Sequence, residues 1–450
     1  MLSTHSVRRR FLSAGMWALV ARVLAGLAGF GANALIARLL SPADVGVYFL
    51  LITIVTFTAG ISQGGLQIGV VRLGAEALGR GLPGRARGAI AKTIWLTAAS
   101  GAVFGVATTL AGPAASAWLG GIALPLATIV LVGLWIPGLS LVNLVAECFR
   151  GLHEYRLASL LNTAVPNLLT LAGVGVLIGA GLTGQLSLVI GVVVGVLAGV
   201  IVLALILLGQ RLSALGPATA VGAGELLATG LPLMVTSLAI YAMTQMDVWI
   251  VGALCGKQDV ALYGSAARLV LLVMMPMLIG NVVLPPLVAE LHGRAEPQRL
   301  ERLVRTTATL SGLIAVPVLL VLLVAAGPIL ALAYGEYYRA GGAVLILLCA
   351  GQTINVLAGP GSTVLMMTGG GREVMAISIF SGLLLAGTAW LAAGQFGMVG
   401  VAAAAGGSSA THGLLCMAVV RYRNGIWTGF GFTQLRGSVA EIRLRLGARD

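Results

Sequence analysis

The chain has 450 residues, of which 58% are apolar and only 9% are charged. Ordinary soluble domains carry about 25% charged residues, so this chain cannot cover itself with a charged surface. The composition excludes a soluble enzyme, a disordered protein and a nucleic-acid-binding domain, in spite of the formal net charge of +13. It indicates a protein with many membrane spans.

The small residues and the aromatic residues indicate which kind of membrane protein this is. Glycine accounts for 64 residues, roughly twice its usual share, and helices packed in lipid favour small residues at their contacts. Aromatic residues make up 6% of the chain, too few for the aromatic girdles of a transmembrane β-barrel. The four cysteines are far apart and form no Cys-x-x-Cys pair, so neither zinc nor a disulfide framework is indicated. We therefore predict an all-α membrane protein.

The predicted elements are membrane-spanning helices, each of which needs about 20 mostly apolar residues. Turn chemistry such as Ser41-Pro42-Ala43-Asp44 separates neighbouring spans. Only Gly394-Gln395-Phe396-Gly397 divides the last two spans. The twelve predicted spans are, in chain order, 12–37, 43–69, 90–112, 122–147, 157–180, 184–208, 226–252, 260–288, 304–332, 341–367, 374–394 and 397–420.

The positions of the basic residues test this span count independently, because cytoplasmic loops of membrane proteins collect Lys and Arg. If the N-terminus, with Arg8, Arg9 and Arg10, lies inside, the even-numbered gaps and the C-terminal tail also face inside. Together with Lys92 and Arg305, which lie at the very start of the spans that follow, these segments hold 22 of the 27 basic residues. We therefore predict twelve transmembrane helices with both termini cytoplasmic, followed by a basic cytoplasmic tail over 421–450.

The sequence contains a weak internal repeat. Asp44-Val45-Gly46-Val47-Tyr48 opens the second predicted span, and Asp259-Val260-Ala261-Leu262-Tyr263 opens the eighth, 215 residues later. Coincidence in a chain rich in Val and Leu is the alternative. Two six-span halves enter the membrane from the same side, as in repeats related by an axis along the membrane normal. This predicts an N-terminal six-helix lobe over 1–215 and a C-terminal six-helix lobe over 216–420 around a central cavity, an architecture that suits alternating access.

Charged residues within or beside the predicted spans are the main candidate site residues. A charge at a helix centre costs about 2.5–3.5 kcal/mol on insertion scales and persists where it faces water or a partner. Arg22, Asp247 and Arg268 lie inside spans, whereas Arg72 and Glu147 close spans at the inner face. The forked donors of Arg22 and Arg268 match two phosphate oxygens, which suits an anionic group in the cavity. The alternatives are an ion pair between Asp247 and Arg268, and snorkelling of Arg72 and Glu147 to the interface.

Uncharged amides form a second layer of polar residues, which could bind sugar hydroxyls in a wet cavity or link neighbouring helices. We include Asn33 and Gln245 among the candidate cavity residues. The full set is Asn33, Gln63, Gln67, Asn143, Asn162, Gln245, Asn281, Gln352 and Asn355. Prolines such as Pro137, Pro317 and Pro360 interrupt many spans and permit kinks.

Motifs for ATP hydrolysis or enzyme chemistry do not stand out in the sequence. It contains no G-x-x-x-x-G-K-[ST] phosphate loop, and its four histidines are scattered. We therefore expect a protein that is not an enzyme and that needs no cofactor. Transport would run on an ion gradient, on the membrane potential or downhill on the substrate, with H⁺ or Na⁺ as the candidate coupling ion.

Three stretches carry a resemblance to a known family. They are Ala37-Arg38-Leu39-Leu40-Ser41-Pro42-Ala43-Asp44-Val45-Gly46-Val47-Tyr48, Asp247-Val248-Trp249-Ile250-Val251-Gly252 and Tyr263-Gly264-Ser265-Ala266-Ala267-Arg268. These segments resemble polysaccharide-biosynthesis flippases of the O-antigen type, which belong to the multidrug/oligosaccharidyl-lipid/polysaccharide transporter superfamily. Lipid II flippases of this superfamily usually have fourteen helices, so the twelve predicted here make that subgroup less suitable.

The resemblance implies a function, a location and partners. The protein would flip a polyprenyl-diphosphate-linked oligosaccharide from the inner to the outer leaflet of the bacterial cytoplasmic membrane, for surface polysaccharide assembly. It would use a cationic, water-filled cavity, which fits Arg22 and Arg268. Its partners would be membrane lipids, with a polysaccharide polymerase and glycosyltransferases as further candidates, and no nucleic acid.

Two alternative functions stay open. A cation-coupled multidrug exporter of the same superfamily would have a cavity dominated by acidic groups, whereas the two deepest basic residues outnumber the single deep acid, Asp247. A non-transporting scaffold of a polysaccharide-assembly complex is the other alternative.

Overall fold

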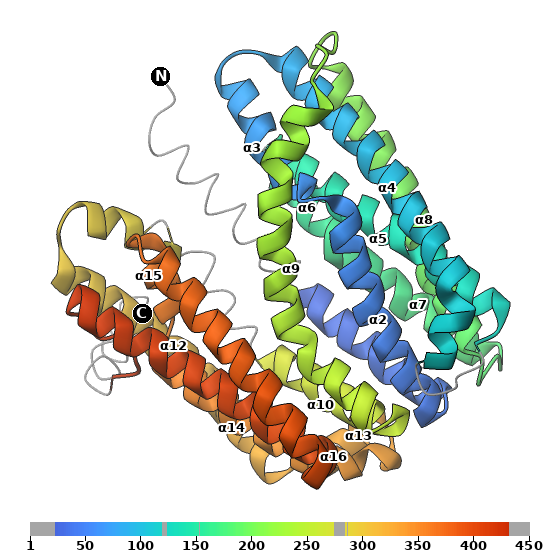
Figure 1. Ribbon diagram of the computed structural model, residues 1–450, viewed down its shortest axis with the longest axis vertical. Helices are drawn as coiled ribbons and strands as arrows, with labels where there is room; N and C mark the ends of the chain where they lie inside the picture. Colours follow the sequence, from blue (N-terminus) through green and yellow to red (C-terminus); the bar gives the residue numbers. More distant parts are fainter. Residues whose placement is uncertain (1–22, 119–123, 153, 274–283, 286, 432–450) are drawn as a thin grey trace, which may run out of the picture. The chain divides into compact units, whose positions relative to one another are not determined.

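The structure is a computed structural model that describes residues 23–118, 124–152, 154–273, 284–285 and 287–431 (Figure 1). Within these ranges the chain is helical and contains no strand. Eight of the described helices are long and apolar enough to cross a membrane. An all-α membrane protein is therefore confirmed. The count of twelve spans and the cytoplasmic termini stay predictions, since the predicted spans 12–37 and 260–288 run into residues outside these ranges.

The described residues form two compact units. Unit 1 lies within residues 1–245 and 256–258, and unit 2 lies within 246–255 and 259–450. The boundary at Gln245–Met246 falls inside one helix, α9 (Ala223–Leu254). The lobes 1–215 and 216–420 stay predictions, and the structure describes the predicted tail 421–450 only as far as residue 431.

Unit 1 begins with an apolar helix over Val23–Leu39. At the start of α2, the Ser41 side chain accepts a hydrogen bond from the Asp44 N–H at 3.2 Å, and Pro42 occupies the first turn, which are typical helix-start features. The following elements are α2 (Pro42–Gln63), α3 (Leu66–Gly79), α4 (Pro83–Trp118), α5 (Leu126–Gly151), α6 (Tyr155–Ser159), the π-helical turn η1 (Leu160–Ala164), α7 (Val165–Gly179), α8 (Leu186–Ser213) and most of α9.

The predicted continuous span 43–69 is broken in the structure, into α2 and α3. Gly64 and Gly65 lie between the two helices with φ of 57° and 70°, a left-handed conformation that favours glycine. A Cβ on Gly65 would lie 1.9 Å from the carbonyl oxygen of Gly230 in α9. The break therefore packs directly against the backbone of α9, and only glycine fits there.

Unit 2 is formed by the end of α9 and the elements that follow. Its apolar core joins α12, α15 and α16 through Val304, Val364, Leu365, Cys416 and Val420. The elements are α10 (Lys257–Val273), α12 (Pro297–Val324), α13 (Ala326–Tyr334), the 3-10 turn η2 (Glu336–Gly341), α14 (Gly342–Ala358), α15 (Gly361–Met367) and α16 (Gly371–Asn424).

Two predicted spans of unit 2 differ in detail from the structure, and one predicted division agrees with it. The predicted span 304–332 is divided at Ala325 between α12 and α13, and the predicted span 341–367 ends at Ala358, before Gly359 and Pro360. The predicted division around 394–397 coincides with Gly397, whose φ of 57° and ψ of −144° interrupt α16. Glycine and proline are the residues at which a helix most readily breaks.

Glycines bring helix backbones into close contact inside each unit. A Cβ on Gly351 of α14 would lie 2.2 Å from the carbonyl oxygen of Gly406 in α16. In unit 1, a Cβ on Gly105 of α4 would lie 2.5 Å from the carbonyl oxygen of Gly133 in α5. This is the close packing of small residues that membrane helices use, and it accounts for part of the high glycine content.

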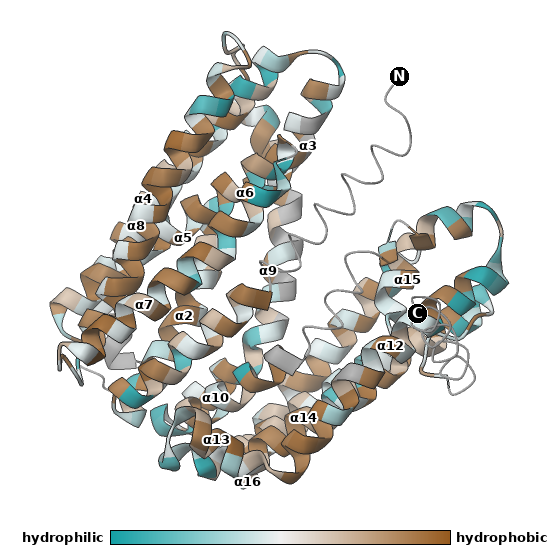
Figure 2. Ribbon diagram, turned by 180° about the vertical axis from the view of Figure 1, so that it is seen from behind, coloured by the Kyte–Doolittle hydropathy of each residue, from teal (hydrophilic) through white to brown (hydrophobic). Residues whose placement is uncertain are grey.

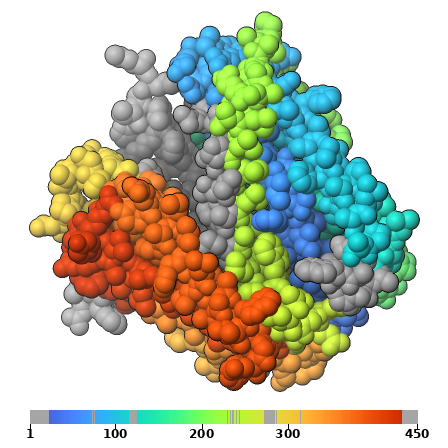
Figure 3. Space-filling view, viewed as in Figure 1, coloured from blue at the N-terminus to red at the C-terminus, as the bar shows by residue number. Residues whose placement is uncertain are grey.

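Apolar side chains also cover the outer faces of long helices. On α4, Trp95, Val103 and Leu110 are 75%, 66% and 77% exposed, and hydrophobic residues run along most of the helix lengths (Figure 2). Both halves of α16 are visible on the surface in Figure 3. Leu391 of this helix is exposed. Such surfaces suit lipid rather than water.

The two copies of the sequence repeat occupy matching places in their helices. Asp44 is the third residue of α2 and Asp259 is the third residue of α10. Tyr48 and Tyr263, one turn further along, are both buried. A carboxylate in the first turn of a helix is favoured by the helix dipole, so the repeat has at least a local structural role.

Candidate functional site

The carboxylate of the half-buried Asp247 in α9 is held by a tyrosine of the next helix. The Tyr263 hydroxyl of α10 donates a hydrogen bond to Asp247 Oδ2 at 2.7 Å. The Val248 N–H donates to the other oxygen, Oδ1, at 2.9 Å. Tyr263 is fully buried. Both carboxylate oxygens of Asp247 therefore have donors inside unit 2.

Arg268 lies on α10, five residues after Tyr263, and is half-buried. Its guanidinium donates to the Gly264 carbonyl of the preceding turn at 3.2 Å. In the same unit, the ring of Tyr334 in α13 lies 5.5 Å from the ring of Tyr338 in η2. Unit 2 thus holds a guanidinium group and a tyrosine pair.

The ion pair between Asp247 and Arg268 was one alternative that the sequence left open. Among the described residues, the carboxylate oxygens of Asp247 accept from Tyr263 and Val248, while Arg268 donates to Gly264. These contacts describe a carboxylate–phenol pair and a guanidinium that donates to a backbone carbonyl, and the ion pair between Asp247 and Arg268 stays an open alternative. The carboxylate–phenol pair can exchange a proton or hold a cation, and the guanidinium can bind an anionic oxygen.

The candidate acid of unit 1 has a partner in its own helix. Glu147, near the end of α5, forms an ion pair with Arg150 one turn later. This contact is an ordinary helix-surface pair, and a place of Glu147 at the membrane interface or in a cavity stays a prediction. Arg72 belongs to α3, but its side chain lies outside the described part of the structure, as does the whole of Arg22.

The two candidate amides lie in different surroundings within unit 1. The Asn33 side-chain N–H donates to the Gly29 carbonyl of its own helix at 2.6 Å. Its Oδ1 atom is buried, and no described residue donates to it. Gln245 is half-buried and is the last residue of α9 that belongs to unit 1. The role of both amides in a cavity stays a prediction.

Sequence reasoning did not assign a role to Tyr263, although the residue lies in both the repeat and the resembling segments. The helical hairpin offers the signal that was missed. Asp247 and Tyr263 lie at equal sequence distances on either side of Cys255, where α9 ends and Gly256, with φ of 110°, turns the chain. Residues at equal distances from a tight turn between antiparallel helices face each other across it.

Comparison with known proteins identifies the family of this chain. The family model described as "Polysaccharide biosynthesis protein" matches residues 35–341, more than half of the chain. The chain belongs to this polysaccharide biosynthesis protein family. The matched range includes α2 to α10, with Asp247, Tyr263 and Arg268. No curated protein matched the sequence.

Solved structures give the fold of this polysaccharide biosynthesis protein. It is similar to the inward-facing form of a multidrug resistance MATE family transporter of the MOP superfamily, with a TM-score of 0.74, 14% identity, and 89% and 94% coverage of the two chains. It is similar to that family's outward-facing form, with a TM-score of 0.61, 14% identity and coverage of 92% and 95%.

A third similar structure is a MOP superfamily transporter from Pyrococcus furiosus, whose description states that reverse polarity of its binding pocket suggests a different function. Its TM-score is 0.63, with 14% identity and coverage of 92% and 95%. Identities of this size establish the fold alone. Family, fold and long apolar helices together support a multi-pass membrane protein of the polysaccharide biosynthesis protein family.

Proposed function

We propose that this protein is a flippase that moves a polyprenyl-diphosphate-linked oligosaccharide from the inner to the outer leaflet of the bacterial cytoplasmic membrane by alternating access. The observation that carries the proposal is the family match over residues 35–341 of a chain with a transporter fold. A polysaccharide biosynthesis protein that is also a transporter needs a saccharide substrate that must cross a membrane, and a lipid-linked oligosaccharide is such a substrate.

The polar groups of unit 2 support the substrate class. Arg268 presents a guanidinium, whose forked donors suit the paired oxygens of a diphosphate. Arg22 would supply a second cation, and Arg72, Glu147, Asn33 and Gln245 remain candidate contacts to the headgroup and its sugars. The substrate's diphosphate would thus be recognised by charge, and its sugars by amides and hydroxyl groups.

Asp247 is the residue that would couple transport to its energy source. A carboxylate that accepts from Tyr263 and from a backbone N–H can carry a proton or a Na⁺ ion through a membrane protein. Coupling to H⁺ or Na⁺, without another cofactor, is therefore the form of transport that we propose. Membrane lipids surround the protein, and a polymerase and glycosyltransferases would act on the same glycan.

A multidrug exporter is the second candidate, because the similar MATE structures are described as multidrug resistance transporters. Such a protein would need an acidic site for cationic drugs, and Asp247 is the group that could supply it. In this case removal of Asp247 would abolish drug export, whereas removal of Arg268 would have little effect.

Proteoliposomes with a fluorescent polyprenyl-diphosphate oligosaccharide test the proposal. Flipping is followed by a membrane-impermeant enzyme that modifies glycans exposed on the outside. We expect Arg268→Ala to slow flipping at least tenfold and Arg268→Lys to keep an intermediate rate, because a lysine retains the charge but loses the forked donors. Arg339→Ala is the matched control, since Arg339 is exposed and pairs with Glu336 in the same turn.

Full flipping activity in a double variant that lacks both Arg22 and Arg268 would contradict the role of these two cations in binding the substrate. Unimpaired surface polysaccharide in a deletion strain that becomes sensitive to a panel of cationic drugs would contradict the flippase and favour the exporter. Lost polysaccharide with normal flipping in vesicles would instead favour a scaffold role.

A further inference from the structure

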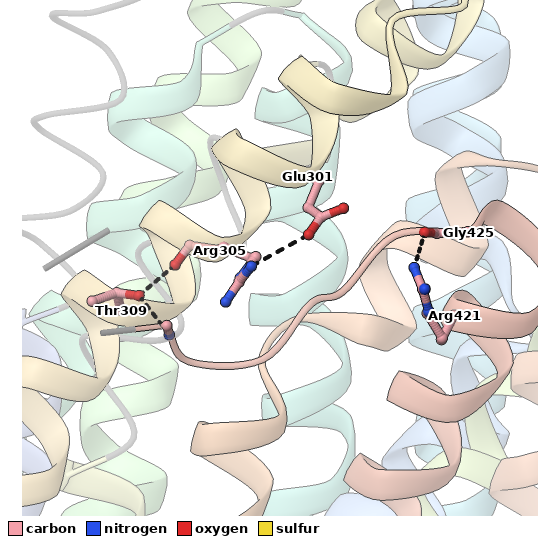
Figure 4. Close-up of polar contacts among 6 residues, drawn as sticks. Glu301, Arg305, Thr309, Arg421 and Gly425 are labelled. Carbon is pink, nitrogen blue, oxygen red and sulfur yellow. Dashed lines mark hydrogen bonds and ion pairs between the residues drawn. The ribbon is translucent and has the colours of Figure 1, made fainter. Parts of the chain in front are cut away.

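The chain does not leave the protein when α16 ends. Gly425, with φ of 70°, turns it back, and the Arg421 side chain donates to the Gly425 carbonyl (Figure 4). The next residues lie across the ends of α12 and α14. We call the segment from Gly425 to Gly431 the strap. It lies beyond the range that the family model matches.

The strap pairs with the helix break between α14 and α15. The Phe430 N–H donates to the Leu357 carbonyl at 2.9 Å, and the Thr428 hydroxyl donates to the Ala358 carbonyl at 2.8 Å. In an unbroken helix these carbonyls would accept from the next turn. Because Gly359 and Pro360 end α14, the strap supplies donors that the broken helix cannot.

The fit at Gly359 indicates that the strap and the break match in shape. Gly359 has φ of 79°, and a Cβ on it would lie 2.1 Å from the Thr428 carbonyl oxygen. Thr428 is fully buried. Any side chain at position 359 would therefore have to displace the strap.

A third helix holds the far end of the strap. The Gly431 N–H donates to Thr309 Oγ1 of α12 at 3.3 Å, and that hydroxyl donates to the Arg305 carbonyl at 2.7 Å. Figure 4 shows Thr309 and Arg305 on α12, where Arg305 also pairs with Glu301 at 3.3 Å. The Phe430 ring lies 3.2 Å from where a Cβ on Gly312 would be.

The first four residues of the strap alternate between exposed and buried positions. Ile426 is 2% exposed and belongs to the core that joins α12, α15 and α16. Trp427 is 45% exposed, and the Arg421 guanidinium lies 5.2 Å from the centre of its ring. An exposed Trp with a cation over its face is typical of a membrane–water interface, so the strap has a protein face and an interfacial face.

We propose that the strap is a conformational device that controls how readily the α14–α15 break bends. When the strap is bound, the carbonyls of Leu357 and Ala358 are satisfied, and α12, α14, α15 and α16 move as one body. When it is released, those carbonyls lose their donors and the break becomes pliable. The link between strap release and substrate movement rests on the proposed flippase function, whereas binding of the strap to the break does not.

Cysteine labelling tests whether the strap is bound as described. The four native cysteines are replaced by alanine, and Thr428→Cys and Trp427→Cys are introduced singly. N-ethylmaleimide should modify position 428 at least tenfold more slowly than position 427. Gly359→Ala should raise the rate at position 428 toward that at 427. The matched control Gly369→Ala should not, because Gly369 also has a positive φ, of 82°, but only the flexible end of Arg423 lies near its Cβ position. Equal rates at 427 and 428 without Gly359→Ala would overturn the bound strap.

Flipping by two shortened chains and one point variant tests its role in transport. A chain that ends at Gly431 keeps the strap and should flip at the full rate, whereas a chain that ends at Asn424 lacks it and should lose most activity. Thr428→Val, which keeps the shape and removes one hydrogen bond, should change the rate at least threefold in a folded protein. Full activity in both the Asn424 chain and Thr428→Val would overturn the control role. If neither the full-length protein nor any variant flips the substrate, while position 428 is still protected from N-ethylmaleimide, the flippase function is contradicted and the binding of the strap is still supported.

Discussion

A broken span occurs in each unit, and in each break a backbone carbonyl occupies the place of a glycine side chain. In unit 1 the Gly230 carbonyl of α9 lies 1.9 Å from a Cβ built on Gly65, and in unit 2 the Thr428 carbonyl of the strap lies 2.1 Å from one built on Gly359. The local chemistry is the same, but the partner differs. A helix fills the first break, and a short non-helical segment near the end of the chain fills the second.

This difference matters for motion, because the two partners are held in different ways. Gly230 is fixed by the hydrogen bonds of α9 on both sides, so the α2–α3 break cannot lose its partner unless α9 itself unfolds. The strap is continuous with a helix only at Gly425, and its bonds to the break and to α12 can be exchanged for bonds to water. The α2–α3 break is a permanent feature, and the α14–α15 break is an adjustable one.

The largest effect is expected from Gly65→Ala. The new Cβ would clash with a backbone that cannot retreat, and its φ would be strained, so the variant should lose about 3 kcal/mol or more of stability. Thermal unfolding in detergent measures this loss. The neighbouring Gly64→Ala is the control, because its φ is 57° but its nearest contact lies 4.0 Å away, and it should lose only about 1 kcal/mol. Equal losses would mean that strain, not packing on α9, defines this break.

A smaller loss of stability is expected from Gly359→Ala, about 2 kcal/mol, because the strap can withdraw and leave only the strained φ and lost hydrogen bonds. The same thermal unfolding measures the effect. A loss as large as that of Gly65→Ala would contradict the comparison, since the strap would then be as immobile as α9.

The charged groups extend the comparison, because Asp247 in unit 2 is held across two helices and Glu147 in unit 1 is held within one. Tyr263→Phe removes the phenol donor from Asp247 and should destabilise the protein by about 1.5 kcal/mol, with a change in the ion dependence of flipping. Tyr337→Phe, at an exposed ring, is the control for tyrosine loss. If the unfolding temperature and the ion dependence both stay unchanged, the hydrogen bond from Tyr263 has no role in stability or in ion coupling at Asp247.

The smallest effect is expected from Glu147→Gln. The Glu147–Arg150 pair is a one-turn contact near a helix end, and its loss should cost about 0.5 kcal/mol at most. Flipping and unfolding temperature should both stay near those of the unchanged protein. A tenfold loss of flipping with an unchanged unfolding temperature would instead move Glu147 into the transport site.

Much of the fold could be predicted from the sequence, because a chain that crosses lipid must form long apolar helices, and these are visible in the sequence. The predicted spans 90–112, 122–147 and 184–208 correspond to α4, α5 and α8, and the division near Gly397 was found from a glycine-rich turn. The Gly64–Gly65 break was missed because its cause is the backbone of α9, far away in the sequence. Pro360 was identified as a point of interruption, but nothing local indicates that residues 425–431 complete it.

The candidate site was less accessible from the sequence than the fold. Asp247 and Arg268 were selected because charges are rare in spans, and each has a hydrogen-bond partner within unit 2. Tyr263 was not selected, since a tyrosine in an apolar segment is unremarkable until its position in the hairpin is considered. The strap was hidden in a tail whose arginines were read only as orientation signals.

The interruption at Gly397 has a consequence for biosynthesis. The two halves of α16 meet at one non-helical residue, so no loop exists there in which a topogenic charge could lie, and residues 394–397 carry none. The orientation of both halves must come from Arg372 at the start and from Arg421 and Arg423 at the end, which lie on the same side of such a hairpin. The two halves should therefore be inserted by the translocation machinery as a pair, and neutralising these arginines should misorient both together.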